Sequence, residues 1–171
     1  MKGTLLQRMD QGIRQFVPVG LTLLLILLDA MPARLPGYAP VSPLLPIISV
    51  YYWSFCRPDL LPPAVAFALG LVNDVIMGSP LGVSSLVYLL VQGMTLSQRR
   101  LLSGRPFMVG WLGFLVIGSG AIALQWSMIS MIFGHFLDLR AVLFEVLMTV
   151  SFYPLVSWLF ARAQLALLKS S

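Results

Sequence analysis

The sequence predicts an all-α integral membrane protein with six transmembrane helices and both termini in the cytoplasm. Of its 171 residues, 58% are hydrophobic and only 10% are charged, whereas soluble domains carry about 25% charged residues. The charges fall between long apolar runs, which is the pattern of a polytopic membrane protein. These runs use nearly all of the chain, so we expect one membrane domain over residues 1–171.

Short turns rich in proline, glycine or arginine separate the six apolar segments. Pro154 lies inside the sixth segment and predicts a kink there. The fifth segment has 27 residues, more than a hydrocarbon core of about 30 Å requires. It must therefore tilt or break at Gly118–Gly120, and we favour the tilt. The predicted spans cover residues 16–31, 41–56, 60–77, 81–96, 107–133 and 141–168.

The positions of the basic residues predict the orientation of these spans. Nine of the 11 Lys and Arg residues fall on the side of the termini, and two, Arg34 and Arg140, fall on the other side. The positive-inside rule then places both termini in the cytoplasm. Tyr51, Tyr52 and Trp53 are expected in the aromatic belt at the cytoplasmic interface. The nine cytoplasmic cations are Lys2, Arg8, Arg14, Arg57, Arg99, Arg100, Arg105, Arg162 and Lys169.

Composition also excludes several classes of function. The net charge is +5, but the cations sit in short loops beside the spans, so it reports topology and not nucleic-acid binding. Cys56 is the only cysteine and His135 the only histidine, which rules out an intrachain disulfide and a structural zinc cluster. No cofactor is expected.

The residues before the first span form a weakly amphipathic arm. Two alternatives stay open for it: an interfacial helix on the inner leaflet or a frayed basic leader. Its apolar face would comprise Leu5, Met9, Ile13 and Phe16, with Arg8, Gln11 and Arg14 elsewhere.

The stretch Gly70–Gly82 holds the carboxylate that most needs an explanation. Within a span, Asp74 costs about 2.5–3.5 kcal/mol at the centre, and near a helix C-terminus it is also disfavoured by the helix dipole. We therefore expect Asp74 to be protonated, hydrated from the outer surface or paired. Arg34 and Arg140 are the natural partners on the outer side, and a Lys or Arg of a partner protein is the other possibility. The candidate interface or structural residues are Ala66, Gly70, Asn73, Asp74, Gly78 and Gly82.

Two other functions are alternatives to a structural role for these polar groups: an intramembrane enzyme and a transporter. Asp29 and Asp74 could share a proton in an intramembrane enzyme, and His135 lies near Asp138, but there is no Gly-x-Ser-x-Gly elbow. We therefore predict no enzymatic activity. A transporter could instead use a polar path, whose side chains would be Asn73, Asp74, Gln92, Gln125 and Glu145.

The order and spacing of one segment, Pro43 to Gly82, resemble the bacterial rod shape-determining protein MreD family. Chain length, short loops and a basic cytoplasmic side agree with this family as well. The residues that carry the resemblance are Pro43-Leu44-Leu45, Tyr51-Tyr52-Trp53, Pro58, Phe67, Gly70-Leu71, Asp74 and Gly78-Ser79-Pro80-Leu81-Gly82.

The resemblance implies a non-enzymatic membrane scaffold of the machinery that builds lateral peptidoglycan. Such proteins partner MreC, a bitopic protein, and work beside a RodA-type glycosyltransferase and its transpeptidase, with the MreB filament involved indirectly. The family is also similar in fold to the substrate-binding subunits of energy-coupling-factor transporters. That similarity supports the alternative expectation of a transporter-like protein that binds a small solute or membrane lipid.

Overall fold

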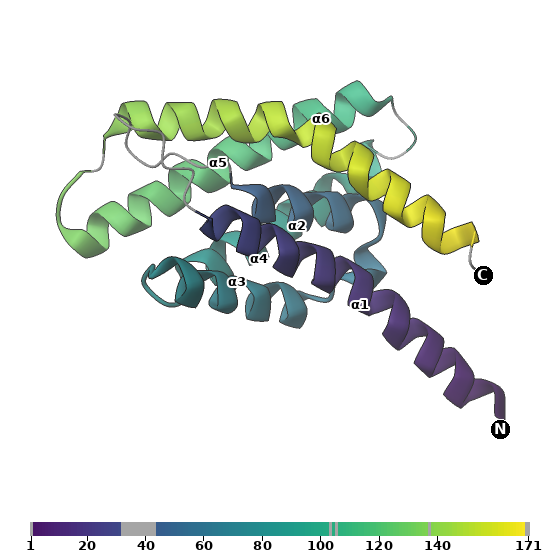
Figure 1. Ribbon diagram of the computed structural model, residues 1–171. Helices are drawn as coiled ribbons and strands as arrows, with labels where there is room; N and C mark the ends of the chain where they lie inside the picture. Colours follow the sequence, from purple (N-terminus) through teal and green to yellow (C-terminus); the bar gives the residue numbers. More distant parts are fainter. Residues whose placement is uncertain (1, 32–43, 103, 105, 137, 170–171) are drawn as a thin grey trace.

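Every element of the structure is helical, as the sequence predicts. The computed structural model describes residues 2–31, 44–102, 104, 106–136 and 138–169 (Figure 1). The elements are α1 (Lys2–Ala30), α2 (Leu45–Cys56), a short 3₁₀ helix η1 (Pro58–Leu60), α3 (Pro63–Met77), α4 (Val83–Leu102), α5 (Phe107–Phe133) and α6 (Leu139–Lys169).

The short helix α2 forms the centre of the bundle. It contacts α1, α4, α5 and α6, while α3 packs on α4 and α1. Nine of its 12 residues are buried, and Figure 1 shows it between the α5–α6 pair and the α1–α3 side, with the two chain ends at one end of the bundle. The apolar run Leu45–Cys56 is therefore used to fill the core rather than to face lipid.

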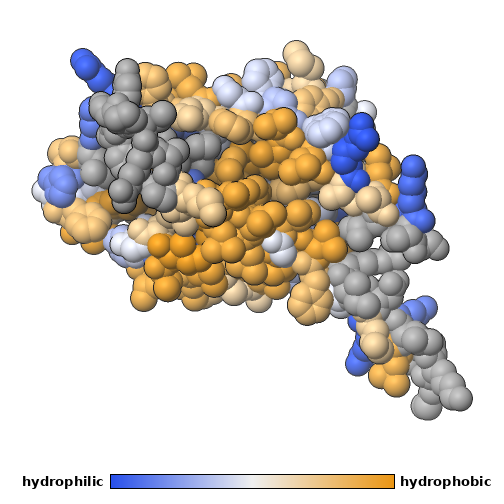
Figure 2. All heavy atoms as spheres, in the orientation of Figure 1, coloured by the Kyte–Doolittle hydropathy of each residue, from blue (hydrophilic) through white to orange (hydrophobic). Residues whose placement is uncertain are grey.

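Among the residues that the structure describes, two helices have the length and composition to cross a membrane: α5 and the Leu139–Ala166 part of α6. By contrast, α2 rises only about 18 Å at 1.5 Å per residue, short of a core of about 30 Å. The apolar helices Gln15–Ala30 and Pro63–Met77 are also short. Figure 2 shows an apolar band across the middle of the molecule, with hydrophilic residues toward the two ends. This surface fits a membrane protein. The number of membrane spans, six, stays a prediction.

The fifth segment forms one continuous helix with the bounds that the sequence predicts, 107–133. It does not break at Gly118–Gly120. Gly118 lies one turn after Phe114 on the same helix, and an added Cβ would lie 3.1 Å from a carbon of that ring. The first segment is longer than expected, since α1 begins at Lys2 and includes the amphipathic arm.

The prediction that Tyr51, Tyr52 and Trp53 form an interfacial belt is wrong. Tyr51 and Trp53 are 0% and 1% exposed, and the Tyr51 hydroxyl donates a hydrogen bond to the carbonyl of Gly110 on α5 (2.8 Å). Aromatic rings from α5 and α6 surround Tyr51, so α2 holds the two long helices together through ring contacts. The Tyr51 ring lies against those of Phe55, Phe114 and Tyr153.

Pro154 lies inside α6, and Figure 1 shows this helix changing direction near its middle. A proline has no N–H, so the carbonyl four residues earlier, that of Val150, loses its helical donor. The indole Nε1–H of Trp111 on α5 donates to this carbonyl at 3.2 Å. The kink thus places a carbonyl where a neighbouring helix can bind it.

Replacing Trp111 by Phe should lower the free energy of unfolding by two contributions. The smaller ring packs less well, and the lost hydrogen bond costs about 0.6 kcal/mol more, the average for an interhelical hydrogen bond in membranes. Unfolding of the detergent-solubilised chain in a denaturing detergent measures this change.

A double-mutant cycle with Pro154→Ala provides the control. An alanine at 154 returns a helical donor to Val150, so Trp111→Phe should then cost less. Equal costs in the two backgrounds would contradict the role assigned to the indole.

Candidate functional site at the end of the bundle opposite the chain termini

Asp74 is fully buried, 0% exposed, near the end of α3. Its carboxylate accepts a hydrogen bond from the Gly82 N–H at 2.9 Å and from the Ser84 N–H at 3.2 and 3.3 Å to its two oxygens. Ser84 lies in the first turn of α4 and Gly82 directly precedes this helix, where backbone N–H groups have no partner within the helix itself. Asp74 therefore caps the following helix.

This arrangement resolves the electrostatic problem of a carboxylate near a helix C-terminus. The positive end of the α4 dipole lies against Asp74 and opposes the unfavourable negative end of α3. The backbone carbonyl of Asp74 also accepts hydrogen bonds from Gly78 and Ser79 at the end of α3. One residue thus closes both helices of the α3–α4 hairpin.

Glycine conformation makes the hairpin turn possible. Gly78 and Gly82 have φ angles of 68° and 97°, in the region that favours glycine. Gly78 ends α3 in the left-handed conformation of a helix C-cap. The two glycines of the predicted set therefore shape the turn that brings the α4 amides to Asp74.

The small-residue face of α3 packs against α4. A Cβ on Gly70 would lie 2.4 Å from the Cα of Ser85, so the two backbones are too close for any larger residue. The Ser85 hydroxyl donates to the Phe67 carbonyl (3.1 Å), and the Asn73 amide donates to the Ser84 hydroxyl (3.0 Å). Ala66 is 0% exposed. The predicted residues thus meet inside the hairpin.

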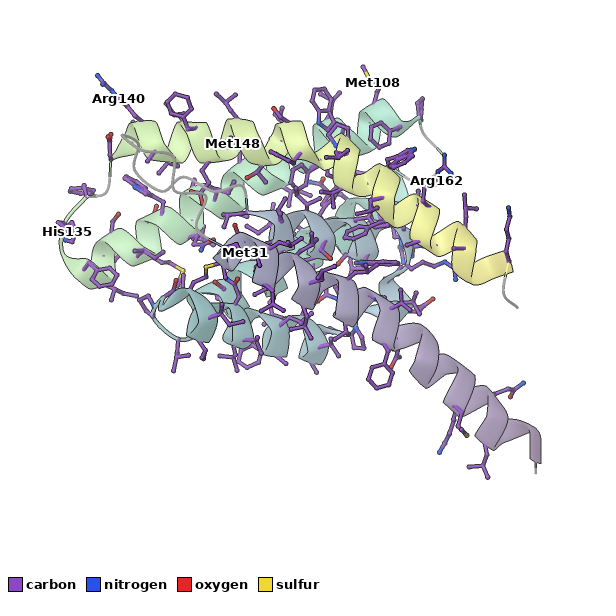
Figure 3. The ribbon with its side chains drawn as sticks, in the orientation of Figure 1. Met31, Met108, His135, Arg140, Met148 and Arg162 are labelled. Carbon is purple, nitrogen blue, oxygen red and sulfur yellow. The ribbon has the colours of Figure 1, made fainter. Side chains whose placement is uncertain are left out.

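Among the residues that it describes, the structure places neither predicted cation beside Asp74. Arg34 lies outside the described residues. Arg140 is exposed at the start of α6, and Figure 3 shows its side chain directed away from the bundle. In the part of the chain that the structure describes, the hydrogen-bond donors of the Asp74 carboxylate are the backbone amides of α4. The sequence suggested ion pairing because it does not show where a following helix will begin in space.

An acidic groove of about 290 Å³ lies between α5 and α6. We define it by its lining: Leu44, Ile122, Gln125, Trp126, Ile129, Asp138, Ala141, Val142 and Glu145. Asp29, at the end of α1 and 8% exposed, lies close enough to Glu145 for their charges to interact. Gln125 Oε1 and Trp126 Nε1 are buried without a hydrogen-bond partner. Such atoms in a pocket are suited to a bound group.

The structure does not bring the predicted transporter residues into one path. Gln125 and Glu145 line the acidic groove, whereas Asn73 and Asp74 belong to the hairpin. Gln92, farther along α4, donates to the Leu61 carbonyl at 2.6 Å. The predicted polar groups therefore lie in three separate environments.

The carboxylates and the histidine show no arrangement typical of catalysis. Both oxygens of Asp74 already accept amide hydrogens, so a proton shared with Asp29 would have to displace a helix cap. His135 is exposed, with Nδ1 3.2 Å from the Phe133 carbonyl, and Asp138 accepts the Arg140 N–H at 3.0 Å. Among the described residues, no group of three or more His, Cys, Asp or Glu could hold a metal.

The sequence analysis missed Ser84, Ser85 and Trp126 as site residues. Ser84 carried one usable signal, because a serine after a glycine turn at the start of a helix is typical of an N-terminal turn. Trp126 carried none, since an aromatic residue in an apolar helix is usual. Its place beside Glu145 follows only from the packing of α5 on α6.

An apolar helical bundle with capped helix ends and a groove between two long apolar helices fits an integral membrane protein. The chain belongs to the rod shape-determining protein MreD family, whose model matches residues 9–163, nearly the whole chain. The resemblance over Pro43–Gly82 is thereby confirmed and extended. Comparison with curated proteins and with solved structures finds no match, so the likeness to energy-coupling-factor subunits stays a prediction.

Membership of the family establishes the general role of the chain. The MreD family consists of bacterial inner-membrane proteins and forms part of the MreBCD system that determines rod shape. The chain is thus a cell-shape protein of the bacterial inner membrane.

Replacing Asp74 by Ala should lower the free energy of unfolding by about 2 kcal/mol, because buried amides lose their acceptor. Asp138→Ala is the matched control, since it removes an exposed helix cap and should cost about 0.5 kcal/mol. Denaturation in mixed detergents measures both variants. Equal losses would contradict the cap assigned to the buried carboxylate.

Gly70→Ala should destabilise the chain by about 1–3 kcal/mol, because its Cβ would overlap the backbone of Ser85. Gly120, also in a helix, has no neighbouring atom within 4 Å of the added Cβ. Gly120→Ala should therefore be neutral or stabilise by up to about 1 kcal/mol. The thermal midpoints of the two variants in detergent check the contrast, and a harmless Gly70→Ala would refute the close approach.

Proposed function

We propose that the chain is a non-enzymatic scaffold of the cell-elongation machinery, which supports lateral peptidoglycan synthesis by binding an MreC-like bitopic protein. A RodA-type glycosyltransferase and its transpeptidase would lie beside this complex, and the MreB filament would connect to it indirectly. Family membership supports the general role in rod shape. The partners are the finer part of the proposal.

The observation that carries the proposal is the acidic groove. Two carboxylates, Asp138 and Glu145, stand among apolar side chains of α5 and α6, with Asp29 near Glu145. Arg140, the nearest cation along α6, points away (Figure 3). This chemistry suits a Lys or Arg beside a transmembrane helix, because the apolar stem packs on the lining while the charge meets a carboxylate.

The proposed topology is the one expected from the cations: six membrane-spanning segments with both termini in the cytoplasm. The two chain ends at one end of the bundle support it (Figure 1). The groove residues Asp138 and Glu145 lie toward the other end, at the start of α6. The groove would then open on the outer side, where the extracytoplasmic part of a bitopic partner leaves the membrane.

The candidate interface set of the hairpin has a supporting part in this proposal. Asp74, Gly70 and Asn73 hold α3 against α4, and Ala66, Gly78 and Gly82 complete that packing and turn. Their effect on a partner would be indirect, through the position of α4, which packs on α5. A direct interface would instead centre on the groove.

The same groove supports the alternative function, binding of a small solute or a lipid headgroup. Its volume of about 290 Å³ lies at the lower end of ligand pockets, and Gln125 Oε1 and Trp126 Nε1 supply unpaired polar atoms. A solute with this role should raise the thermal midpoint of the purified chain. A scaffold should respond to its protein partner and to no such solute.

Changing Glu145 to Gln together with Asp138 to Asn should weaken co-purification with a co-expressed MreC-like partner by about tenfold or more, since close interfacial charge pairs contribute about 1.5 kcal/mol or more. Quantitative pull-down from detergent measures the affinity.

Asp59→Asn provides the matched control, because it removes an exposed carboxylate from η1 at the other end. It should leave the association unchanged. If it weakens binding as much as the groove variant, or if neither variant weakens binding, the groove is not the partner site.

A further inference from the structure

The first residues of α1 form an amphipathic arm outside the bundle. We define the N-terminal arm as residues 2–16; Figure 1 shows it projecting from the bundle at the end that also holds the C-terminus. Leu5, Met9 and Phe16 are 68%, 64% and 75% exposed. At about 100° per residue their side chains fall within one narrow stripe along the helix. A large apolar stripe of this kind on a projecting helix needs a surface to cover it.

Cations gather around this stripe and its end of the bundle. Arg8 is exposed on the arm one turn from Leu5, and no described carboxylate forms an ion pair with it. The Nε–H of Arg99 binds the Phe55 carbonyl (3.0 Å), which leaves its terminal nitrogens to other partners. The other described cations at this end are Arg57, Arg100, Arg162 and Lys169.

We propose that the N-terminal arm lies on an anionic lipid leaflet, with Leu5, Met9 and Phe16 at the acyl-chain boundary and Arg8 against phosphate groups. This is the chemistry of interfacial amphipathic helices, which combine an apolar face with basic side chains. It adds a lipid-composition sensor to the scaffold and does not depend on the acidic groove.

Geometry favours lipid over an acidic protein as the occupant. The arm continues without interruption into the part of α1 that packs on the bundle, and Leu5 lies only about 16 Å along the axis from Phe16. Figure 1 shows α1 running obliquely to α5 and to the first half of α6, and an oblique helix keeps such a stripe near the membrane surface. The apolar and basic features therefore face the same boundary at which the bundle ends.

A polarity-sensitive fluorophore on the arm tests the proposal in the full chain. The labelled protein carries Met9→Cys with Cys56→Ser, reconstituted in vesicles of phosphatidylcholine alone or mixed with phosphatidylglycerol. Emission should shift to the blue in the anionic vesicles, and high salt should reverse the shift. With Arg8→Gln, about fivefold more anionic lipid should be needed to produce the same blue shift. This factor corresponds to the loss of one cation near an anionic surface.

Arg140→Gln is the matched control, because it removes an exposed arginine from the opposite end, and it should leave the emission unchanged. Equal emission in the two kinds of vesicle, or equal effects of Arg8→Gln and Arg140→Gln, would overturn the proposal. Fluorophore emission typical of water in both kinds of vesicle would also overturn the proposal and would assign the stripe to a protein partner.

Discussion

The hydrogen bonds from the α4 amides to the Asp74 carboxylate are the interaction on which the hairpin depends. A helix that begins inside an apolar bundle presents N–H groups that water cannot reach, and each one left unpaired is costly. Asp74 removes this cost for α4, while its own backbone carbonyl receives the last amides of α3. The carboxylate that looked out of place in an apolar chain is thus a structural requirement of the turn.

The same constraint explains three other polar contacts inside the bundle. The Val150 carbonyl, freed by Pro154, receives Trp111, and the Phe55 carbonyl near the end of α2 receives Arg99. At the start of α2, Thr149 of α6 accepts the Leu44 N–H at 3.0 Å. At these three places a side chain from a different helix binds the freed backbone group, and the bonds tie the elements together as well as satisfying the backbone.

The described polar groups are divided between the two ends of the molecule. Carboxylates collect at the start of α6 in a groove with apolar walls, and cations collect at the end that holds both termini. An apolar band separates the two ends (Figure 2). The two ends therefore offer surfaces of different charge, and the family of the chain has a shape-determining role.

The sequence by itself determined the helical class, the bounds of α5, the kink at Pro154 and the family, because these depend on composition, local periodicity and the order of residues along the chain. Only the tertiary structure decided that α2 is a central helix, that Tyr51 and Trp53 are buried, and that Asp74 caps α4. Periodicity cannot separate lipid-facing from buried apolar residues, since both environments select the same side chains. Likewise, the partner of a buried carboxylate depends on where the next helix starts in space. The sequence therefore suggested Arg140 as a partner of Asp74, whereas in the folded chain backbone amides bind this carboxylate.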